Sequence, residues 1–246
     1  MHSSTAQPDT AVILAAGRGT RLQGTFSELP KGFLPIDGVP IVERSIRKLM
    51  ARGISRVVIG TGHLSEAYER LAAKYDAIEC VRNEAYAATG SMRTLYGLRE
   101  YISGDFLLLE SDLIYEERAL RVLLEETRAD VILASGRTGS GDEVFVQTDA
   151  HGNLANASKD PQRLASIRGE WVGISRLSSA TLRALCAVAE GQAKLDYEQA
   201  LVHVAAARPI CVRTVEDLVW AEIDDAAHLH RVTAEIAPRI FTRDAA

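Results

Sequence analysis

Short apolar stretches alternate with longer amphipathic ones through the first half of the chain. The apolar stretches are rich in β-branched residues and predict strands at residues 11–15, 57–61, 78–81, 106–109 and 131–135. The segments between them have the spacing of helices with one apolar face. Because strands separated by helices are joined by right-handed crossovers, this pattern predicts an α/β fold: a Rossmann-like, doubly wound, mostly parallel sheet with helices on both faces.

Proline, glycine and small polar residues mark the predicted helix ends. A helix over residues 40–52 has Pro40 near its first turn and Gly53 just beyond its end. A closing helix is predicted from about residue 225 to residue 236. The expected capping residues are Ser65 for a helix to residue 75, Ser91 for a helix to residue 101, and Asp196 for a helix to about residue 207.

After about residue 135 the pattern changes. Residues 144–148 alternate like a half-exposed strand, residues 149–152 form a turn, and residues 171–175 are expected to pair back against that strand. We therefore expect a small β-rich insertion over the site at about residues 136–198, followed by a strand at 210–214.

Composition narrows the function classes. With 246 residues, 47% hydrophobic, the chain can bury a full core, and without repeats or linker-like tracts we expect one domain over residues 10–246 and a disordered tail at 1–9. A net charge of -5 disfavours nucleic-acid binding. No apolar run has the length of a membrane span and residues 1–9 are polar, so we expect a cytoplasmic protein with no membrane contact. Three distant cysteines favour buried reduced thiols.

The segment after the first predicted strand has the composition of a phosphate-binding turn. The strand leads into Ala15-Ala16-Gly17-Arg18-Gly19-Thr20-Arg21-Leu22, and Pro30-Lys31 follows. Small residues let backbone N–H groups approach an anion, and Arg18, Arg21 and Lys31 add three cations. A Walker loop would need Gly-Lys-Ser/Thr, and a dinucleotide fingerprint would need a third glycine at Leu22. The segment therefore predicts a polyphosphate site of another kind.

Two later strand ends carry acids. Glu110 and Asp112 end a buried strand and are two residues apart, which puts them on one side; Glu222 and Asp224 repeat the arrangement near the end of the chain. Ligands of parallel sheets collect at the carboxyl ends of the strands, so Asp112 is expected at the same edge as the glycine turn. Capping or turn roles are the alternatives for these acids. Mg²⁺ is the expected ion for carboxylates combined with phosphate oxygens.

The turn and the acids together resemble a known family. Leu-x-x-Gly-x-Gly-Thr-Arg followed by Pro-Lys is the signature of nucleotidyltransferases that activate a phosphorylated small molecule with an NTP. Over residues 10 to 235 the chain is similar to the phosphonoalkyl cytidylyltransferases, which are relatives of the phosphocholine cytidylyltransferases in the sugar-phosphate nucleotidyltransferase superfamily. The segments that carry this similarity are Pro30-Lys31-Gly32-Phe33-Leu34, Gly90-Ser91-Met92, Leu109 to Glu116, Gly139 to Glu143, Leu195 to Glu198 and Trp220 to Asp225.

The resemblance implies an activity and a set of site residues. It implies transfer of CMP from CTP to 2-aminoethylphosphonate, with Mg²⁺ held by Asp112 and Asp224. Arg21 and Lys31 are assigned to the α-phosphate and pyrophosphate, and Lys159 to the charged oxygens of the acceptor. The nucleotide is assigned to Leu14, Ala15, Ala16, Gly17, Arg18, Gly19, Thr20, Gly90, Ser91 and Glu110, and the acceptor to Asp142, Glu143, Trp171, Asp196, Tyr197, Glu198 and Glu222.

A phosphonate dianion needs no general base, because its second pKa is about 6. This agrees with the lack of a nucleophile–histidine–acid set; His228 and His230 are two apart on a predicted helix and are expected to be solvated. A quaternary ammonium is best bound by aromatic rings, which make up 6% of the chain, whereas a primary ammonium suits the acids above. The alternatives are a phosphocholine or sugar-phosphate nucleotidyltransferase and a non-catalytic nucleotide-sensing module. A homodimer is left open.

Overall fold

The computed structural model describes residues 7–19 and 28–245, and within them the main sheet is mixed. It runs β5–β4–β1–β6–β11–β8–β12, and β9 and β10 extend it from the start of β11. All these strands lie parallel to β1 except β11 and β10. The strands are β1 (Thr10–Ala15), β4 (Arg56–Thr61), β5 (Ile78–Arg82), β6 (Phe106–Glu110), β8 (Val131–Ser135), β9 (Phe145–Thr148), β10 (Leu154–Ser158), β11 (Gly169–Leu177) and β12 (Cys211–Val215).

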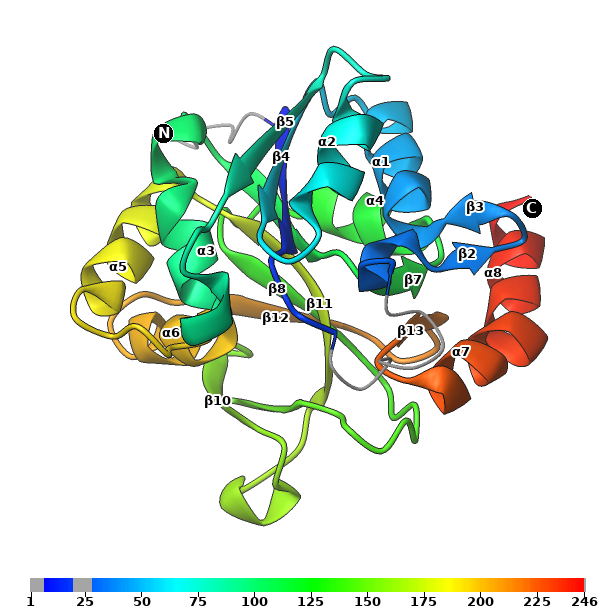
Figure 1. Cartoon of the computed structure of the whole chain (residues 1–246). Coiled ribbons are helices and arrows are strands. Elements are labelled where there is room, and N and C mark those ends of the chain that lie inside the picture. Colours follow the sequence, from blue (N-terminus) through cyan, green and yellow to red (C-terminus); the bar gives the residue numbers. More distant parts are fainter. Residues whose placement is uncertain (1–6, 20–27, 246) are drawn as a thin grey trace.

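Helices cover both faces of the sheet, as the alternating pattern predicted (Figure 1). The β1 strand shows why both are needed: Ala11 and Ile13 pack in one core cluster, whereas Val12 and Leu14 pack in the other. The first cluster is closed by α1 (Ile41–Ala51), α2 (Ser65–Ala72) and α4 (Arg118–Leu124). The second is closed by α3 (Ser91–Gly97), α5 (Ser179–Ala189) and α6 (Tyr197–Ala205).

Short elements complete the fold. They are η2 (Lys31–Phe33), η3 (Tyr86–Ala88), η4 (Arg99–Tyr101), η5 (Pro161–Arg163), the hairpin of β2 (Pro35–Ile36) and β3 (Val39–Pro40), and the antiparallel pair of β7 (Leu113–Tyr115) and β13 (Trp220–Glu222). Asp37 and Gly38 both have positive φ in the β2–β3 turn, as a two-residue hairpin requires. No helix of the described segments is both long and apolar enough to cross a bilayer.

Three predicted helix ends are confirmed and two are wrong. Pro40 occupies the cap position just before α1, Gly53 follows its end with a φ of 87°, and Asp196 caps α6 in a capping box. The cap position of α2 is taken by Leu64, and Ser65 is already helical, so Ser65 is not the cap. Ser91 likewise lies inside α3, and its hydroxyl accepts a hydrogen bond from the Tyr197 backbone N–H of α6 instead. The Ser91 hydroxyl, which the sequence predicted would cap its own helix, therefore binds the start of α6 instead.

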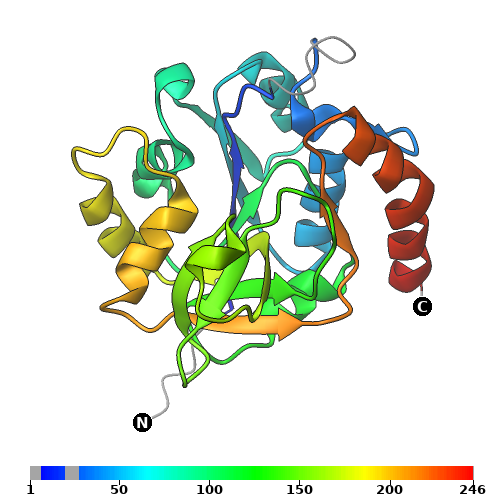
Figure 2. The same ribbon diagram turned by 90° about the horizontal axis from the view of Figure 1, so that it is seen from below.

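The β-rich second half differs from the prediction in its pairing. The strand β9 and the turn after it form as expected, but the turn leads into β10, which was not predicted and pairs with β9; Figure 2 shows this hairpin in front of the main sheet. Only Gly169 and Glu170 of β11 pair with β9; the later residues of β11 pair with β6 and β8. The predicted contact is present at its first residue, because the Trp171 N–H donates to Val144 O at 2.8 Å. The rest of the 171–175 segment belongs to the central sheet, because β11 is long enough to leave the hairpin and continue into the core.

The C-terminal helix is longer than predicted. Instead of ending at residue 236, the chain forms α7 (Ala226–Arg231), a π-helical turn η6 (Val232–Ile236) and α8 (Ala237–Asp244) in direct succession. Pro238 stands in the first turn of α8, where its missing N–H costs least, and the wide η6 turn precedes it.

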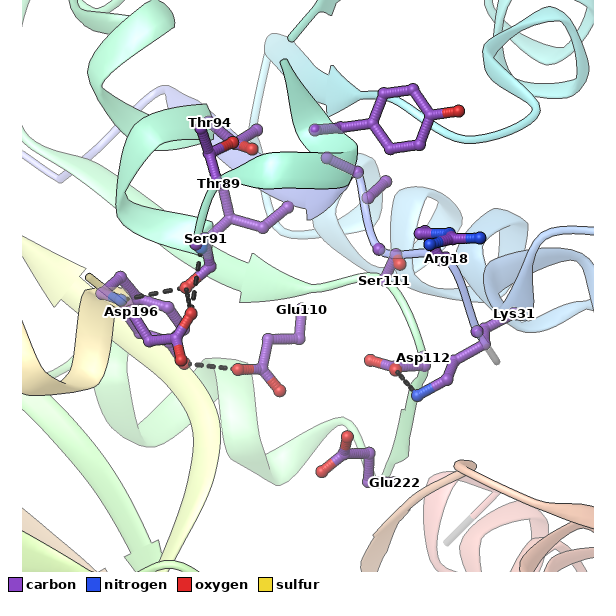
Figure 3. Close-up of a pocket in the computed structure, with 18 of the residues that line it drawn as sticks. Arg18, Lys31, Thr89, Ser91, Thr94, Glu110, Ser111, Asp112, Asp196 and Glu222 are labelled. Carbon is purple, nitrogen blue, oxygen red and sulfur yellow. Dashed lines mark hydrogen bonds and ion pairs between the residues drawn. The ribbon is translucent and has the colours of Figure 1, made fainter. Parts of the chain in front are cut away.

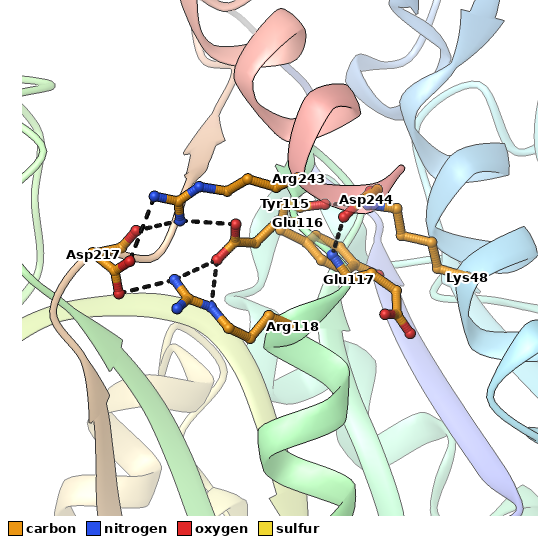
Figure 4. Close-up of polar contacts among 8 residues, drawn as sticks. All are labelled: Lys48, Tyr115, Glu116, Glu117, Arg118, Asp217, Arg243 and Asp244. Carbon is orange, nitrogen blue, oxygen red and sulfur yellow. Dashed lines mark hydrogen bonds and ion pairs between the residues drawn. The ribbon is translucent and has the colours of Figure 1, made fainter. Parts of the chain in front are cut away.

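Hydrogen bonds and ion pairs connect Arg243 and Asp244 of α8 to residues of α1 and of the segment after β7 (Figure 4). Glu116 is 2% exposed and accepts hydrogen bonds from Arg118 Nε at 2.7 Å and Arg243 Nη1 at 3.0 Å. Asp217 pairs with the same two arginines. Asp244 accepts hydrogen bonds from the Glu117 backbone N–H and from Lys48 Nζ, both at 2.7 Å.

We expect Arg243→Met to destabilise the fold by about 1–3 kcal/mol, because buried Glu116 loses one of its two guanidinium partners. Urea unfolding followed by circular dichroism measures the change. The matched control is Arg239→Met, since Arg239 is exposed on the same helix and has no ion pair among the described residues. Equal midpoints for both variants would contradict a role of the network in stability.

Candidate functional site

The carboxyl ends of β1 and β6 open into a cavity of about 530 Å³, the large cavity (Figure 3). Register explains the position: Leu14 lies opposite Glu110, and the Ser111 backbone N–H donates to Leu14 O at 3.1 Å. The residues that line it are Leu14, Ala15, Ala16, Gly17, Arg18, Gly19, Lys31, Tyr68, Tyr86, Thr89, Gly90, Ser91, Thr94, Glu110, Ser111, Asp112, Asp196, Tyr197, Glu198 and Glu222.

The glycine turn forms one wall of the large cavity. The described part of this turn ends at Gly19, whose φ of 59° suits glycine, and the Lys31 side chain packs against it. Arg18 is exposed at the rim of the cavity. Thr20 and Arg21, which were also assigned to the site, lie outside the described residues.

The segment before α3 forms the opposite wall. Asn83 Nδ2 donates to the hydroxyls of Thr89 and Thr94 at 3.1 and 3.0 Å and thereby fixes this wall. A Cβ on Gly62 would lie 2.6 Å from Tyr86 Cβ and 2.8 Å from Ala16 O, so a glycine there lets the two walls approach. The predicted base-binding segments thus face the same cavity.

Asp196 joins this wall to α6. Its Oδ1 accepts hydrogen bonds from the Ser91 backbone N–H at 3.1 Å and from the Ser91 hydroxyl at 3.2 Å. Gly90 packs directly on this connection, because a Cβ there would lie 2.3 Å from Leu195 O. The geometry therefore gives Asp196 and Ser91 a role in holding two helix starts together, at the edge of the large cavity.

Lys31 links the two acids that sequence assigned to a metal. Its ammonium donates to Asp112 Oδ2 at 3.1 Å and also to Asp224 Oδ1. Asp224 is 1% exposed. Burial lowers the pKa of Lys31, but the carboxylates of Asp112 and Asp224 outweigh burial and raise it above 10.5, so the ammonium stays charged.

Backbone pairing brings these distant acids together. β13 pairs with β7, and the Ile223 N–H donates to Asp112 O at 3.1 Å. Asp225 then caps α7 by accepting a hydrogen bond from the His228 backbone N–H. One acid of the pair Asp224–Asp225 therefore faces the site, and the other begins the helix.

Additional carboxyl groups crowd the same end of the large cavity. In Figure 3 Glu110, Asp112 and Glu222 surround one region, and Tyr197 Oη donates to Glu110 Oε1 at 2.8 Å. Burial raises the pKa of Glu222 to about 9 and of Glu198 to about 7, and the neighbouring acids add to both shifts. Burial also raises the pKa of Glu110 well above 4.5. So many acids in one place favour a cationic ligand.

A second cavity of about 100 Å³, the small cavity, adjoins the large one. The two share Glu110, Glu198 and Glu222. The remaining residues that line the small cavity are Thr138, Ser140, Asp142, Glu143, Val144, Lys159, Trp171, Val172, Gly173, Trp220, Ala221 and Arg231.

Sequence-predicted acceptor residues divide between the two cavities. Lys159, Asp142, Glu143 and Trp171 line the small cavity. Asp196 and Tyr197 line only the large one. The Tyr197 ring packs edge-on against the Trp171 ring, with the two ring centroids 6.3 Å apart.

Sequence reasoning missed several residues that line the two cavities. They are Tyr68, Thr94 and Ser111 in the large cavity and Thr138, Ser140 and Arg231 in the small one. Ser111 and Ser140 lie within segments that carry the family resemblance, and Arg231 lies one helical turn after His228.

The expectation that His228 is solvated is wrong, whereas His230 is exposed as expected. His228 is half-buried, and its Nε2 lies 3.2 Å from Ser140 O.

Two groups of side chains could hold a metal ion. Ligand atoms of His228, Asp142 and Asp224 lie within 4.8 Å of one another, as do those of Glu110, Asp112 and Glu222. These two groups flank Lys31 and present mainly oxygen atoms, which fit a hard divalent cation.

Comparison with known proteins identifies the family. The model of the MobA-like NTP transferase domain matches residues 11–218. The CMP-5'-(3-aminopropyl)phosphonate synthase of Streptomyces rubellomurinus is 30% identical over 95% of this chain, which spans only 40% of that relative. The 2-aminoethylphosphonate cytidylyltransferase of Lancefieldella rimae is 25% identical, with 93% of this chain and 94% of that one covered. The fold matches the T. maritima inositol-1-phosphate CTP transferase with a TM-score of 0.82, covering 98% and 97% of the chains at 18% identity.

We expect Lys31→Met to destabilise the protein by about 3–5 kcal/mol near pH 8, because buried Asp224 loses its ion pair with the Lys31 ammonium. MgCl₂ without nucleotide should restore part of this loss and change the wild type little, since the wild-type ammonium already lies between the acids. Thermal unfolding measures both effects, with Lys194→Met, a change at an exposed position, as the control. A Mg²⁺ shift of equal size in wild type and Lys31→Met would contradict this interpretation.

Proposed function

The chain belongs to the MobA-like NTP transferase family and is a nucleotidyltransferase, and we propose that it transfers CMP from CTP to a short phosphonate. The favoured acceptor is 2-aminoethylphosphonate, and the products are CMP-2-aminoethylphosphonate and pyrophosphate. Two relatives whose names specify phosphonate substrates support this choice.

The main support for this proposal is that the large and small cavities differ in size and lining and meet at Glu110, Glu198 and Glu222. The large cavity has the glycine turn on one wall and the segment around Gly90 on the other, which suits a nucleotide with its base and ribose against small residues. The small cavity opens from the acidic end, where the nucleotide phosphates are proposed to lie. A second substrate in the small cavity would therefore meet those phosphates.

The proposed step is a direct displacement at phosphorus. An ionised phosphonate oxygen attacks the α-phosphorus of CTP, a new P–O bond forms, and the bond to the β-phosphate oxygen breaks as pyrophosphate leaves. No side chain has to remove a proton, because the nucleophile is already ionised. Lys31 and Arg18 line the large cavity and would neutralise phosphate charge, together with Arg21.

Asp112 and Asp224 would hold the divalent cation, for which we propose Mg²⁺. Their oxygen atoms already converge on the Lys31 ammonium, which supports this pair as a cation site. Such an ion would reduce the negative charge of the triphosphate. Lys31 would then be free to contact a phosphate oxygen.

The small cavity favours a short zwitterionic acceptor. Its volume of about 100 Å³ is well below the 300 Å³ or more of typical small-molecule sites, which disfavours a sugar phosphate. Lys159 can interact with an anionic group, and Asp142 and Glu143 with a primary ammonium. Trp171 and Trp220 also line the small cavity, and this observation keeps phosphocholine as the second candidate, since tryptophan attracts quaternary ammonium groups.

A substrate panel tests the proposal. Pyrophosphate release is measured with each of four NTPs and with 2-aminoethylphosphonate, 3-aminopropylphosphonate, phosphocholine, inositol phosphate and glucose 1-phosphate. We expect CTP with 2-aminoethylphosphonate to give the highest kcat/KM. Preference for phosphocholine would replace the acceptor assignment, and no release with any pair would overturn the proposed activity.

We expect Asp112→Asn to lower Mg²⁺-dependent turnover on the order of 100- to 1000-fold while the protein stays folded. The reason is loss of one charged oxygen from the proposed cation site. Steady-state rates across a Mg²⁺ titration, with circular dichroism for folding, measure the effect. Asp76→Asn, at an exposed position, serves as the control. Full activity of Asp112→Asn would remove Asp112 from the cation site.

A further inference from the structure

One face of α7 closes the small cavity. His228 and Arg231 are three residues apart on this helix and so lie on the same side of it. His228 Nε2 lies 3.2 Å from Ser140 O, and Arg231 Nη1 donates to Thr138 O at 3.3 Å. Both contacts go to backbone carbonyls of the segment that connects β8 to β9. This helix therefore holds the connecting segment over the small cavity.

The guanidinium of Arg231 has donors left over. Within the described part of the chain it forms no ion pair, and its one hydrogen bond goes to the Thr138 carbonyl. Its Nε is shielded from solvent and has no partner. Because Arg231 also lines the small cavity, the remaining donors of its guanidinium are available to an anionic ligand there.

Arg231 lines the small cavity one helical turn after His228. The helix that carries it begins directly after Asp224 and Asp225, and His228 is grouped with Asp142 and Asp224 within 4.8 Å. The proposed reaction requires the acceptor's phosphonate next to the nucleotide phosphates, and these are proposed to lie at Asp112 and Asp224. An acceptor with its phosphonate near Asp224 would therefore lie about one helical turn from Arg231 along α7.

We propose that Arg231 binds the phosphonate group of the acceptor and, with Lys159, sets the preference for a dianionic substrate. This inference rests on the proposed function and adds a residue that the sequence did not single out. The planar guanidinium can donate two parallel hydrogen bonds to phosphonate oxygens. Charge neutralisation by Arg231 would lower the repulsion between the acceptor and the triphosphate.

The test compares Arg231→Gln, Arg231→Lys and the control Arg239→Gln with the wild type. We expect Arg231→Gln to raise the acceptor KM on the order of 10- to 100-fold, the size expected for a charge-assisted hydrogen bond, and to leave the CTP KM within about twofold. Arg231→Lys should recover part of the loss, because it keeps the charge but not the paired donors. Arg239→Gln should equal the wild type.

Two competitive inhibitors separate substrate binding from a structural role. Methylphosphonate carries the anion alone, and ethylamine carries the ammonium alone. Arg231→Gln should weaken inhibition by methylphosphonate and leave inhibition by ethylamine unchanged. Equal weakening of both inhibitors, or an equal rise of the CTP KM, would show that Arg231 only supports the Thr138 segment and would overturn the inference.

Failure of the Arg231 inference can be told apart from failure of the proposed function. If the wild type releases no pyrophosphate with any acceptor, the proposed function fails before the variants are compared. If the wild type is active and Arg231→Gln keeps the wild-type acceptor KM, the proposed function stands and the role of Arg231 is wrong. Thermal unfolding of each variant shows whether a loss of activity reflects unfolding.

Discussion

The ion pairs of Lys31 with Asp112 and Asp224 are the contacts on which the site depends. They join the short helix after the glycine turn, the end of the central β6 strand and a segment more than a hundred residues later. Without a cation between them, Asp112 and nearly inaccessible Asp224 would repel each other. Under the proposed function, a divalent ion would replace the ammonium between these acids and leave Lys31 to a phosphate.

Buried acids gather where the two cavities meet. Glu110, Glu198 and Glu222 stand at their junction, and burial raises the pKa of each. An anionic substrate would need a positively charged group beside it to bind near these acids. The groups that provide positive charge come from separate elements: Lys159 follows β10, and Arg231 ends α7. A zwitterionic acceptor would complement both signs of charge in the small cavity.

Much of the architecture was predictable because the signals were local. The apolar runs of β1 and β8 and the capping residue Asp196 depend on neighbours in sequence, and the structure has them as predicted. Ser91 shows the limit of such reasoning. Its hydroxyl has a capping residue's chemistry, but α6 packs against it and takes the hydrogen bond. A local rule fails where a partner more than a hundred residues away offers a better contact.

The sequence alone determined the α/β class, the family and the pair of acids that approach the glycine turn, because each depends on residue types at short spacing or at strand ends. Only the tertiary structure decided what those acids contact and which side chains close the small cavity. Arg231 lines it and His228 contacts the adjoining Ser140 carbonyl, because α7 follows β13 and β13 pairs with β7. Strand pairing at that distance is set by packing of the whole core, which no local pattern of residues encodes.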